Sequence, residues 1–242
     1  RILGSSNPFY SYLDKFSKIQ NKKINFLQIG SNDGLVNDNI REFIVRDHWS
    51  GILVEPQPVV FRKLKSNYSK VRDLSRLTFL NVAVSNRMED SANFWTIDES
   101  FANTLPIYKS SSIRRKASFV TPDYLRLACQ ANGVSEDHIV KIKVPVLTIK
   151  KILEDYWQWS NLDLLIVDAE GNDSKIILSI DFSNINPEII IYETPISNSE
   201  SEKLSNFLVQ NNYRLESLYD PRGVSNNDTI AIKNGSAMEN SL

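Results

Sequence analysis

The 242-residue sequence has one cysteine, two histidines and no apolar run of the roughly 18 residues that a membrane-spanning helix needs. The lone Cys129 excludes an internal disulfide, and the lack of paired Cys and His spacings excludes a structural zinc site. Residues 1–20 also lack the charged-then-apolar order of a signal peptide. We therefore expect a protein of a reducing compartment, the cytoplasm, with no membrane span.

An excess of charge of one sign is also missing. The chain has 28 Lys and Arg against 29 Asp and Glu, a net charge of −1, which argues against nucleic-acid binding through the overall field of the protein. A hydrophobic content of 41% is typical of a globular domain. Because the sequence begins at Arg1 and not at a Met, we expect a domain of a larger protein.

Short apolar runs alternate with helical patterns in the first part of the chain. Strands are predicted at Ile24–Ile29, Gly51–Glu55 and Leu77–Val84, and helices at Leu35–Arg46 and Pro58–Tyr68. The strand runs are continuously apolar, which is typical of strands covered by helices on both faces. The sequence therefore predicts an α/β fold with a mainly parallel sheet.

The alternation stops from about residue 86 to residue 138, where Ala92–Ile97 has the pattern of a short edge strand, and we interpret this segment as a substrate-side insertion. It resumes with strands at Ile142–Leu147, Leu162–Val167 and Glu188–Tyr192, and with helices at Ile149–Trp157, Asp173–Ser179 and Ser199–Gln210. We expect an N-terminal extension (1–23), one domain (24–233) and a loose tail (234–242).

The last two predicted strands, Tyr213–Leu218 and Thr229–Lys233, are separated by a connection too short for a helix. The connection contains the turn sequence at 220–223, Asp-Pro-Arg-Gly. We therefore expect an antiparallel pair at the end of the sheet, which the plain dinucleotide-binding fold does not have.

A first candidate site follows the first predicted strand, in the loop from Gln28 to Gly34. Its residues Gly30, Ser31, Asn32, Asp33 and Gly34 allow a tight turn and close approach of a ligand to the backbone. The loop is not Gly-x-Gly-x-x-Gly, and its acidic and amide side chains suit a cationic, zwitterionic ligand better than a pyrophosphate. An ordinary strand-to-helix turn remains the alternative.

A second candidate, Glu55, ends the next strand, 21 residues after Gly34. A carboxylate there can accept hydrogen bonds from two ribose hydroxyls, and Pro56 fixes the chain as it leaves the strand. The alternative is a surface charge at a strand end.

These motifs together resemble the FkbM family of S-adenosylmethionine (SAM)-dependent methyltransferases. The resemblance rests on Phe26–Gly34, Val54–Pro58, Asn81–Ser85, Val144–Ile149, Ile166–Gly171 and the strand that ends at Glu193. It implies a Rossmann-like class I methyltransferase fold, whose seven-stranded sheet ends in a reversed hairpin. It also implies that SAM is the cofactor.

The resemblance assigns Gly30, Asn32 and Asp33 to the methionine part of SAM, and Glu55 to the ribose. Val82 and Ala83 would border the adenine. Gln28 departs from the family pattern, which is usually acidic there. An amide lacks the charge attraction for the ammonium group of SAM, so weaker binding is expected.

The third candidate site is the segment Asp168–Gly171, at the carboxyl end of a predicted strand. Asp168 would lie nearest the transferred methyl group and act as a base toward an acceptor hydroxyl, with Glu170 beside it. His138, before the strand that follows the insertion, is a second candidate base.

Asp168 and Glu193 end neighbouring strands and form a tentative magnesium or manganese site, by analogy with sugar methyltransferases outside the family. Two charged strand ends without a metal are the alternative. We interpret the basic run Arg114-Arg115-Lys116 as a solvated face, with an anion clamp as the alternative. Aromatic residues of the insertion would stack on a sugar or pack as core: Trp95, Phe101, Tyr108, Phe119 and Tyr124.

The leading functional hypothesis is a SAM-dependent O-methyltransferase that acts on a hydroxyl of a sugar, a glycan or a secondary metabolite. A nicotinamide-dependent oxidoreductase is disfavoured by the missing glycine motif and by the final hairpin. A third reading is a non-catalytic module with the cofactor fold in a larger glycan-assembly protein.

Overall fold

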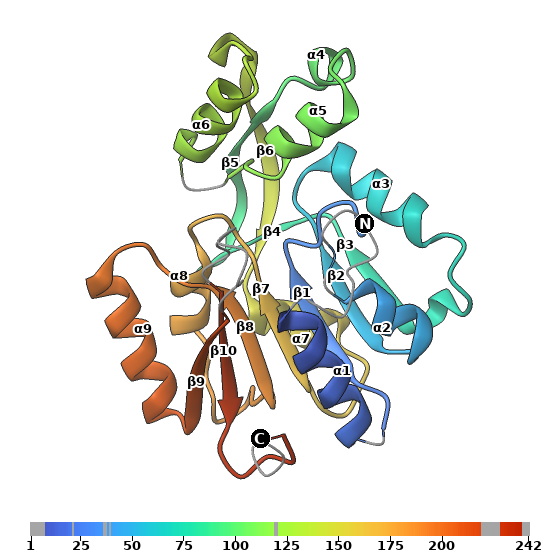
Figure 1. Cartoon of the computed structure of the whole chain (residues 1–242), viewed down its shortest axis with the longest axis vertical. Coiled ribbons are helices and arrows are strands. Elements are labelled where there is room, and N and C mark those ends of the chain that lie inside the picture. The colour runs from blue at the N-terminus through green and yellow to red at the C-terminus, as the bar shows by residue number, and fades with distance from the viewer. Residues whose placement is uncertain are drawn as a thin grey trace.

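The computed structural model describes residues 8–20, 22–35, 38, 40–118, 121–218 and 228–238. At its centre is a seven-stranded sheet with the order β3-β2-β1-β7-β8-β10-β9 (Figure 1). Its strands are β1 Asn25–Ile29, β2 Ser50–Val54, β3 Leu77–Leu80, β7 Leu164–Val167, β8 Ile189–Glu193, β9 Tyr213–Leu218 and β10 Asp228–Lys233.

Strand β10 is antiparallel to both β8 and β9, and the other neighbours in this sheet are parallel. The predicted α/β fold with a mainly parallel sheet and an antiparallel end is therefore confirmed. The turn predicted at 220–223 lies outside the described residues.

Helices cover both faces of the sheet, as the continuously apolar strands predict. One face carries α1 Pro8–Gln20, α2 Arg41–Arg46 and α3 Pro58–Tyr68, and the other carries α7 Ile149–Tyr156, α8 Asp173–Leu178 and α9 Asn198–Gln210. Along β1 the buried side chains alternate, with Phe26 in the first core cluster and Leu27 in the second. The loops at the carboxyl ends of the strands are thus held by two packed layers.

Helix α2 is shorter than predicted, because it begins at Arg41 and not at Leu35. The Asp33 carboxylate accepts a hydrogen bond from the Leu35 backbone N–H at 3.0 Å, and the Asp38 carboxylate accepts one from Ile40 at 3.0 Å. Such local bonds from Asp side chains compete with helix formation, and the described residues 32–35 form turns and bends and not a helix.

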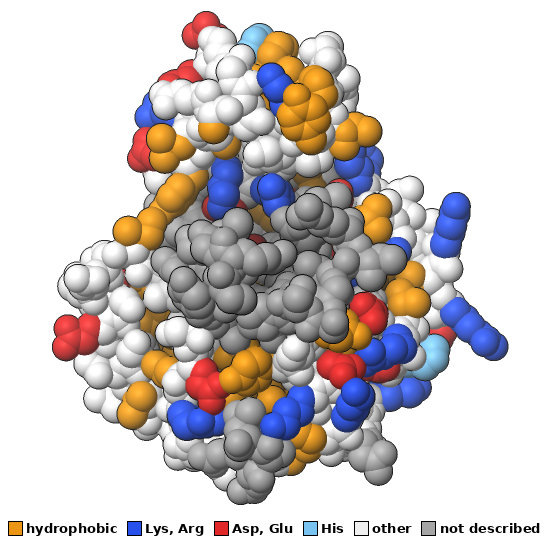
Figure 2. All heavy atoms as spheres, in the orientation of Figure 1, with side chains coloured by type: hydrophobic (Ala, Val, Ile, Leu, Met, Phe, Trp, Pro, Cys, Tyr) orange, Lys and Arg blue, Asp and Glu red, His pale blue; other side chains and the backbone are white. Residues whose placement is uncertain are grey.

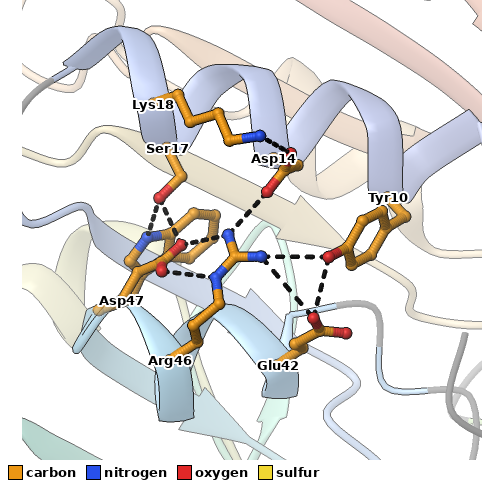
Figure 3. Close-up of polar contacts among 8 residues, drawn as sticks. Tyr10, Asp14, Ser17, Lys18, Glu42, Arg46 and Asp47 are labelled. Atoms are coloured by element: carbon orange, nitrogen blue, oxygen red, sulfur yellow. Dashed lines mark hydrogen bonds and ion pairs between the residues drawn. The ribbon is translucent and has the colours of Figure 1, made fainter. Parts of the chain in front are cut away.

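The predicted N-terminal extension contains a helix, α1, that the sequence patterns did not identify. Its Leu13 and Phe16 are fully buried in the core. Arg46 of α2 joins the two helices through Asp14, with 2.7 Å between Nη2 and Oδ1, and also forms an ion pair with Asp47 (Figure 3). Met238, in the segment predicted to be a loose tail, is fully buried in the same cluster.

A second, three-stranded sheet has the order β4-β6-β5, with β4 Ala83–Val84, β5 Glu89–Ile97 and β6 Ile139–Leu147. The single strand predicted at Leu77–Val84 is therefore wrong: it is two strands in different sheets. Between them the Asn81 side chain donates to the Glu55 carbonyl at 2.8 Å and to the Pro56 carbonyl at 3.1 Å. This contact redirects the chain away from the main sheet.

The region predicted as an insertion rises above the main sheet as a lobe (Figure 1). We call residues 89–118 and 121–147 the lobe; besides β5 and β6 it carries α4 Glu99–Ala102, α5 Ile107–Arg114 and α6 Asp123–Ala131. A short 3-10 helix, Glu136–His138, precedes β6, and another, Leu74–Arg76, precedes β3. Among the described residues, none of the helices combines the length and apolarity that crossing a membrane requires.

Candidate active site

The candidate site lies at the carboxyl ends of β1, β2, β7 and β8. These strands are parallel neighbours, so their carboxyl ends meet at one edge of the sheet. The strand order reverses direction between β1 and β7, and open α/β sheets bind ligands at such a switch point. The three predicted sites, after β1, β2 and β7, are therefore brought together.

The loop after β1 needs glycine at two positions. Gly30 has a φ of +81°, and a Cβ atom there would lie 1.9 Å from the Asp168 backbone oxygen. Gly34 has a φ of +64°, and a Cβ there would lie 2.5 Å from Leu64 and from Tyr68. A side chain at either position would push the loop away from β7 or from α3. The backbone of the first site thus runs directly beside the third.

Ser31 and Asn32 shape the same loop in different ways. The buried Ser31 hydroxyl donates to the Gln28 carbonyl at 3.2 Å, so it stabilises the turn itself. Asn32 has a left-handed φ of +48°, which directs its backbone N–H toward the next strand end. The side-chain oxygen of Gln28 is buried without a hydrogen-bond partner in the described part of the chain.

Glu55 is 4% exposed at the end of β2, and each of its carboxylate oxygens accepts one backbone hydrogen bond. Oε2 accepts from the Asn32 N–H at 3.0 Å, and Oε1 accepts from the Gln57 N–H at 2.8 Å. Burial raises the pKa of Glu55 to about 7, and the charges of Asp168 and Asp33 act in the same direction. Each oxygen retains accepting capacity, which suits a pair of ribose hydroxyls.

The third site carries two acids with raised pKa values. Surrounding protein atoms partly desolvate the Asp168 carboxyl and, together with the Glu193 carboxylate, raise its pKa above the ordinary value. The Asp168 residue is nevertheless exposed to solvent. Burial and the Asp168 charge raise the pKa of Glu170 to about 7, while Lys116 opposes this shift. Groups with such shifts at strand ends are candidates for proton transfer.

A further acid, Asp173, lies beneath this loop and is 4% exposed. Both of its carboxylate oxygens are 3.3 Å from the Ala169 backbone N–H. Burial and the charges of Asp168 and Glu193 raise its pKa well above the ordinary value. Sequence patterns missed Asp173 as part of the site, because it begins a predicted helix.

The interpretation of the basic run at 114–116 as a solvated face is wrong for Arg114, whereas the Lys116 side chain is 42% exposed but ion-paired. Arg114 is 5% exposed, and its guanidinium makes two hydrogen bonds, of 2.9 and 2.8 Å, to the Glu99 carboxylate. Lys116 Nζ lies 2.9 Å from both carboxylate oxygens of Glu170. Both partners are distant along the chain, and a local charge pattern cannot reveal them. Figure 2 shows basic side chains at the base of the lobe.

Gln57 joins the lobe to the end of β2, and the sequence patterns did not identify it as part of the site. Its buried side chain donates to the Arg114 carbonyl at 2.9 Å and accepts from the Thr96 hydroxyl at 3.0 Å. Its backbone N–H meanwhile donates to Glu55. One residue therefore couples the end of β2 to the lobe.

We expect Gln57→Ala to lower the free energy of unfolding by about 1–3 kcal/mol, because it leaves two buried polar partners unsatisfied. Urea denaturation measures this. The matched control is Gln130→Ala, since Gln130 bonds Glu136 at an exposed position, and a change within about 0.5 kcal/mol is expected there. Equal stability of the two variants would contradict the coupling.

The residues predicted to border adenine, Val82 and Ala83, lie between the end of β3 and the start of β4. Val82 is half-buried against the cluster that contains Ile29 and Val54, and Ala83 is buried in the lobe-side cluster. Pro56 is half-buried beside them and accepts from Asn81. These positions are next to Glu55 along the same sheet edge, because the Glu55 N–H donates to the carbonyl of Leu80 at 3.0 Å.

The second candidate base, His138, lies in the lobe, away from the carboxyl ends of β1, β2 and β7. It ends the 3-10 helix before β6, and its ring stacks on Phe101 with a centroid distance of 3.4 Å. Strand β6 pairs with β4 at its opposite end, where Val146 lies beside Ala83. Trp95 and Phe101 pack against the lobe core, whereas Tyr108 is exposed and Phe119 lies outside the described residues. Tyr124 approaches the site, 3.5 Å from where a Cβ on Gly171 would lie.

The tentative metal site is not supported. Nowhere in the described ranges do three His, Cys, Asp or Glu side chains gather in an arrangement that would hold a metal ion. Glu170 lies next to the proposed ligand Asp168, but both of its carboxylate oxygens accept hydrogen bonds from the Lys116 ammonium. Magnesium and manganese need several free oxygen ligands, so this donor set does not fit them.

Comparison with known proteins places the chain in one family. The sequence matches the methyltransferase FkbM domain over residues 28–215. A search of curated proteins found no match.

Three solved structures resemble the fold. The chain is similar to the methyltransferase FkbM from Methylobacillus flagellatus, with 11% identity and a TM-score of 0.51 over 87% of this chain and 43% of that one. It is also similar to the N-terminal domain of human METTL16, with 8% identity and a TM-score of 0.52 over 94% and 69%. The same human domain in complex with SAH gives a TM-score of 0.51, again with 8% identity over 94% and 69%. The chain thus spans less than half of the bacterial protein, and these similarities show the class I methyltransferase fold alone.

Proposed function

Because the chain belongs to the FkbM methyltransferase family, we propose that it transfers a methyl group from SAM to a hydroxyl of a sugar, a glycan or a secondary metabolite. The observation that carries the proposal is the junction of three strand ends. Glu55 after β2 is hydrogen-bonded to Asn32 after β1, and Gly30 of that same loop abuts Asp168 after β7. Adjoining loops thus hold Glu55, the proposed ligand of the cofactor, and Asp168, the proposed base for the acceptor.

In this proposal the loop at 30–34 binds the methionine part of SAM, and Glu55 accepts hydrogen bonds from the two ribose hydroxyls. Pro56, Val82 and Ala83 border the adenine. The bound SAH in the human METTL16 domain supports a SAM-type ligand, since that protein has the same fold. The neutral Gln28 leaves the ammonium of SAM without a carboxylate partner at that position.

The proposed reaction is an in-line displacement. The acceptor oxygen attacks the methyl carbon of SAM while the carbon–sulfur bond breaks, and sulfur keeps the electron pair to give neutral SAH. The hydroxyl proton passes to Asp168, whose raised pKa makes it a better proton acceptor than an ordinary aspartate. Glu170, fixed by Lys116, lies beside this base. His138 has no part in this step.

Cofactor affinity is expected to rise with pH, because ribose hydroxyls donate to the charged form of Glu55. With the pKa of Glu55 at about 7, the carboxylate is mostly protonated at pH 6 and mostly charged at pH 8. The dissociation constant for SAH should therefore be about tenfold larger at pH 6 than at pH 8. Calorimetry at both values checks this, and a constant affinity across this range would argue against Glu55 as the ribose acceptor.

The proposed activity is tested with methyl-labelled SAM and a panel of glycan, glycolipid and small hydroxylated acceptors. Label should appear in an acceptor as an alkali-stable methyl ether, which identifies an oxygen as the target. Transfer to nitrogen or carbon acceptors alone would contradict O-methylation and leave methyl transfer intact. Absence of any SAM or SAH binding would contradict the whole proposal.

A further inference from the structure

The lobe places a positive charge among the acids of the strand ends. Lys116 Nζ lies 2.9 Å from each oxygen of Glu170, whose side chain is 13% exposed. Burial opposes the charge on Lys116, but the carboxylates of Glu170, Glu193 and Asp168 together raise its pKa above the ordinary value. The ammonium, whose side chain is 42% exposed, therefore contacts Glu170 directly, and the charges of Asp168 and Glu193 act on it over a longer range.

The same lobe segment also fixes the backbone that follows Asp168. The Ser118 hydroxyl, two residues after Lys116 in the sequence, donates to the Glu170 carbonyl at 3.1 Å. Lys116 and Ser118 thus bind the side chain and the backbone of the same residue. Glu170 has a φ of +45°, in the left-handed region that non-glycine residues rarely adopt. Such a conformation persists where neighbours hold it and is common at functional sites. Lys116 and Ser118 supply that support from outside the main sheet.

The other neighbours of the acids do not replace this charge. Arg115 lowers the pKa of Asp168 through its charge but forms no ion pair with any of the residues that the structure describes, and its Nε is without a hydrogen-bond partner. Tyr124 is neutral, because burial and the charges of Glu193 and Glu170 raise its pKa. Asp173 adds a further acid.

We propose that Lys116 is a positioning residue that serves the acidic strand ends in place of a divalent cation. Its ammonium balances the charges of Asp168, Glu170 and Glu193 and holds the loop after β7 in the geometry that Asp168 requires. The consequence for catalysis rests on the proposed methyltransferase function, whereas the charge balance is measurable without an acceptor. The proposal accounts for acids at neighbouring strand ends that, among the residues the structure describes, form no set of metal ligands.

Manganese binding tests this directly, because removal of the ammonium leaves the carboxylates without a counter-charge and a divalent cation is then attracted to them more strongly. Mn²⁺ is titrated into the wild-type protein and into Lys116→Met, Lys116→Gln, Lys116→Arg and Lys143→Met, and free Mn²⁺ is followed by electron paramagnetic resonance. The neutral Lys116 variants should bind Mn²⁺ at least about tenfold more tightly than wild type. Lys116→Arg retains the charge and should behave like wild type, as should the exposed control Lys143→Met.

Equal Mn²⁺ affinity of the wild type and both neutral variants would overturn the proposal, since Lys116 would then not balance the acids. Tight Mn²⁺ binding by the wild type would overturn it as well and restore a metal site. Two neutral replacements guard against misfolding of one, and circular dichroism verifies the fold of each. SAH binding is measured in parallel: its absence in the wild type contradicts the proposed function, whereas the Mn²⁺ comparison still decides the role of Lys116.

Discussion

Asp168→Asn is expected to reduce the rate of methyl transfer by about 10²–10⁴-fold, the range that a positioned general base contributes. Asparagine keeps the size of the side chain and removes its ability to take the acceptor proton. Because the carboxylate acts chiefly in the transition state, the loss should appear in kcat, and the affinity for SAH should change little. Labelled methyl transfer under saturating SAM, together with calorimetry of SAH, separates the two quantities.

The matched control for this variant is Asp90→Asn, an exposed aspartate on β5, which should transfer methyl at the wild-type rate. Near-normal turnover by Asp168→Asn would eliminate Asp168 as the base. Attention would then move to Glu170, since its pKa is also raised, to about 7, and its side chain lies in the same loop.

Glu55→Ala is expected to weaken SAH binding by about 10-fold to more than 100-fold, which corresponds to about 1.5–3 kcal/mol. The variant loses both acceptors for the ribose hydroxyls and frees the Asn32 N–H that Glu55 holds. Calorimetry is done at pH 8, where the wild-type carboxylate is charged. Thermal unfolding verifies that the variant is folded.

The exposed Glu202→Gln on α9 serves as the control for Glu55→Ala, and its SAH affinity should equal that of the wild type. A folded Glu55→Ala protein with unchanged affinity would show that the ribose assignment is incorrect. The effect on turnover at saturating SAM should be smaller than that of Asp168→Asn, because Glu55 binds a part of the cofactor that does not react.

Local sequence patterns predicted most of the main sheet, because strands such as β1, β2 and β7 are short apolar runs followed by glycine or an acidic residue; the run at Leu77–Val84 was wrongly taken as one strand. Helix α3 was predicted at Pro58–Tyr68, where it lies, since proline is favoured in a first helical turn. The short connection after Leu218 correctly predicted the antiparallel end of the sheet. Candidate residues after β1, β2 and β7 meet because parallel neighbouring strands end at one edge.

The features that were missed depend on contacts between distant residues. Helix α1 is stabilised by Leu13 and Phe16 packing on the domain core and by Arg46, and none of this is visible within its own sequence. The lobe sheet forms by pairing of β5 with β6, two strands that are separated in the sequence by the lobe helices. Lys116 has the local pattern of a surface charge, but its partner Glu170 is 54 residues away. Long-range packing and ion pairing therefore define the lobe side of the site.

The most direct test of the account is calorimetry of the wild-type protein with SAH and, separately, with NADH. The account predicts that SAH binds at one site per chain, that NADH gives no binding heat, and that SAH binding weakens in Glu55→Ala. Binding of NADH without binding of SAH would contradict the assignment of the strand-end loops to a SAM-type cofactor, and with it the proposed methyl transfer.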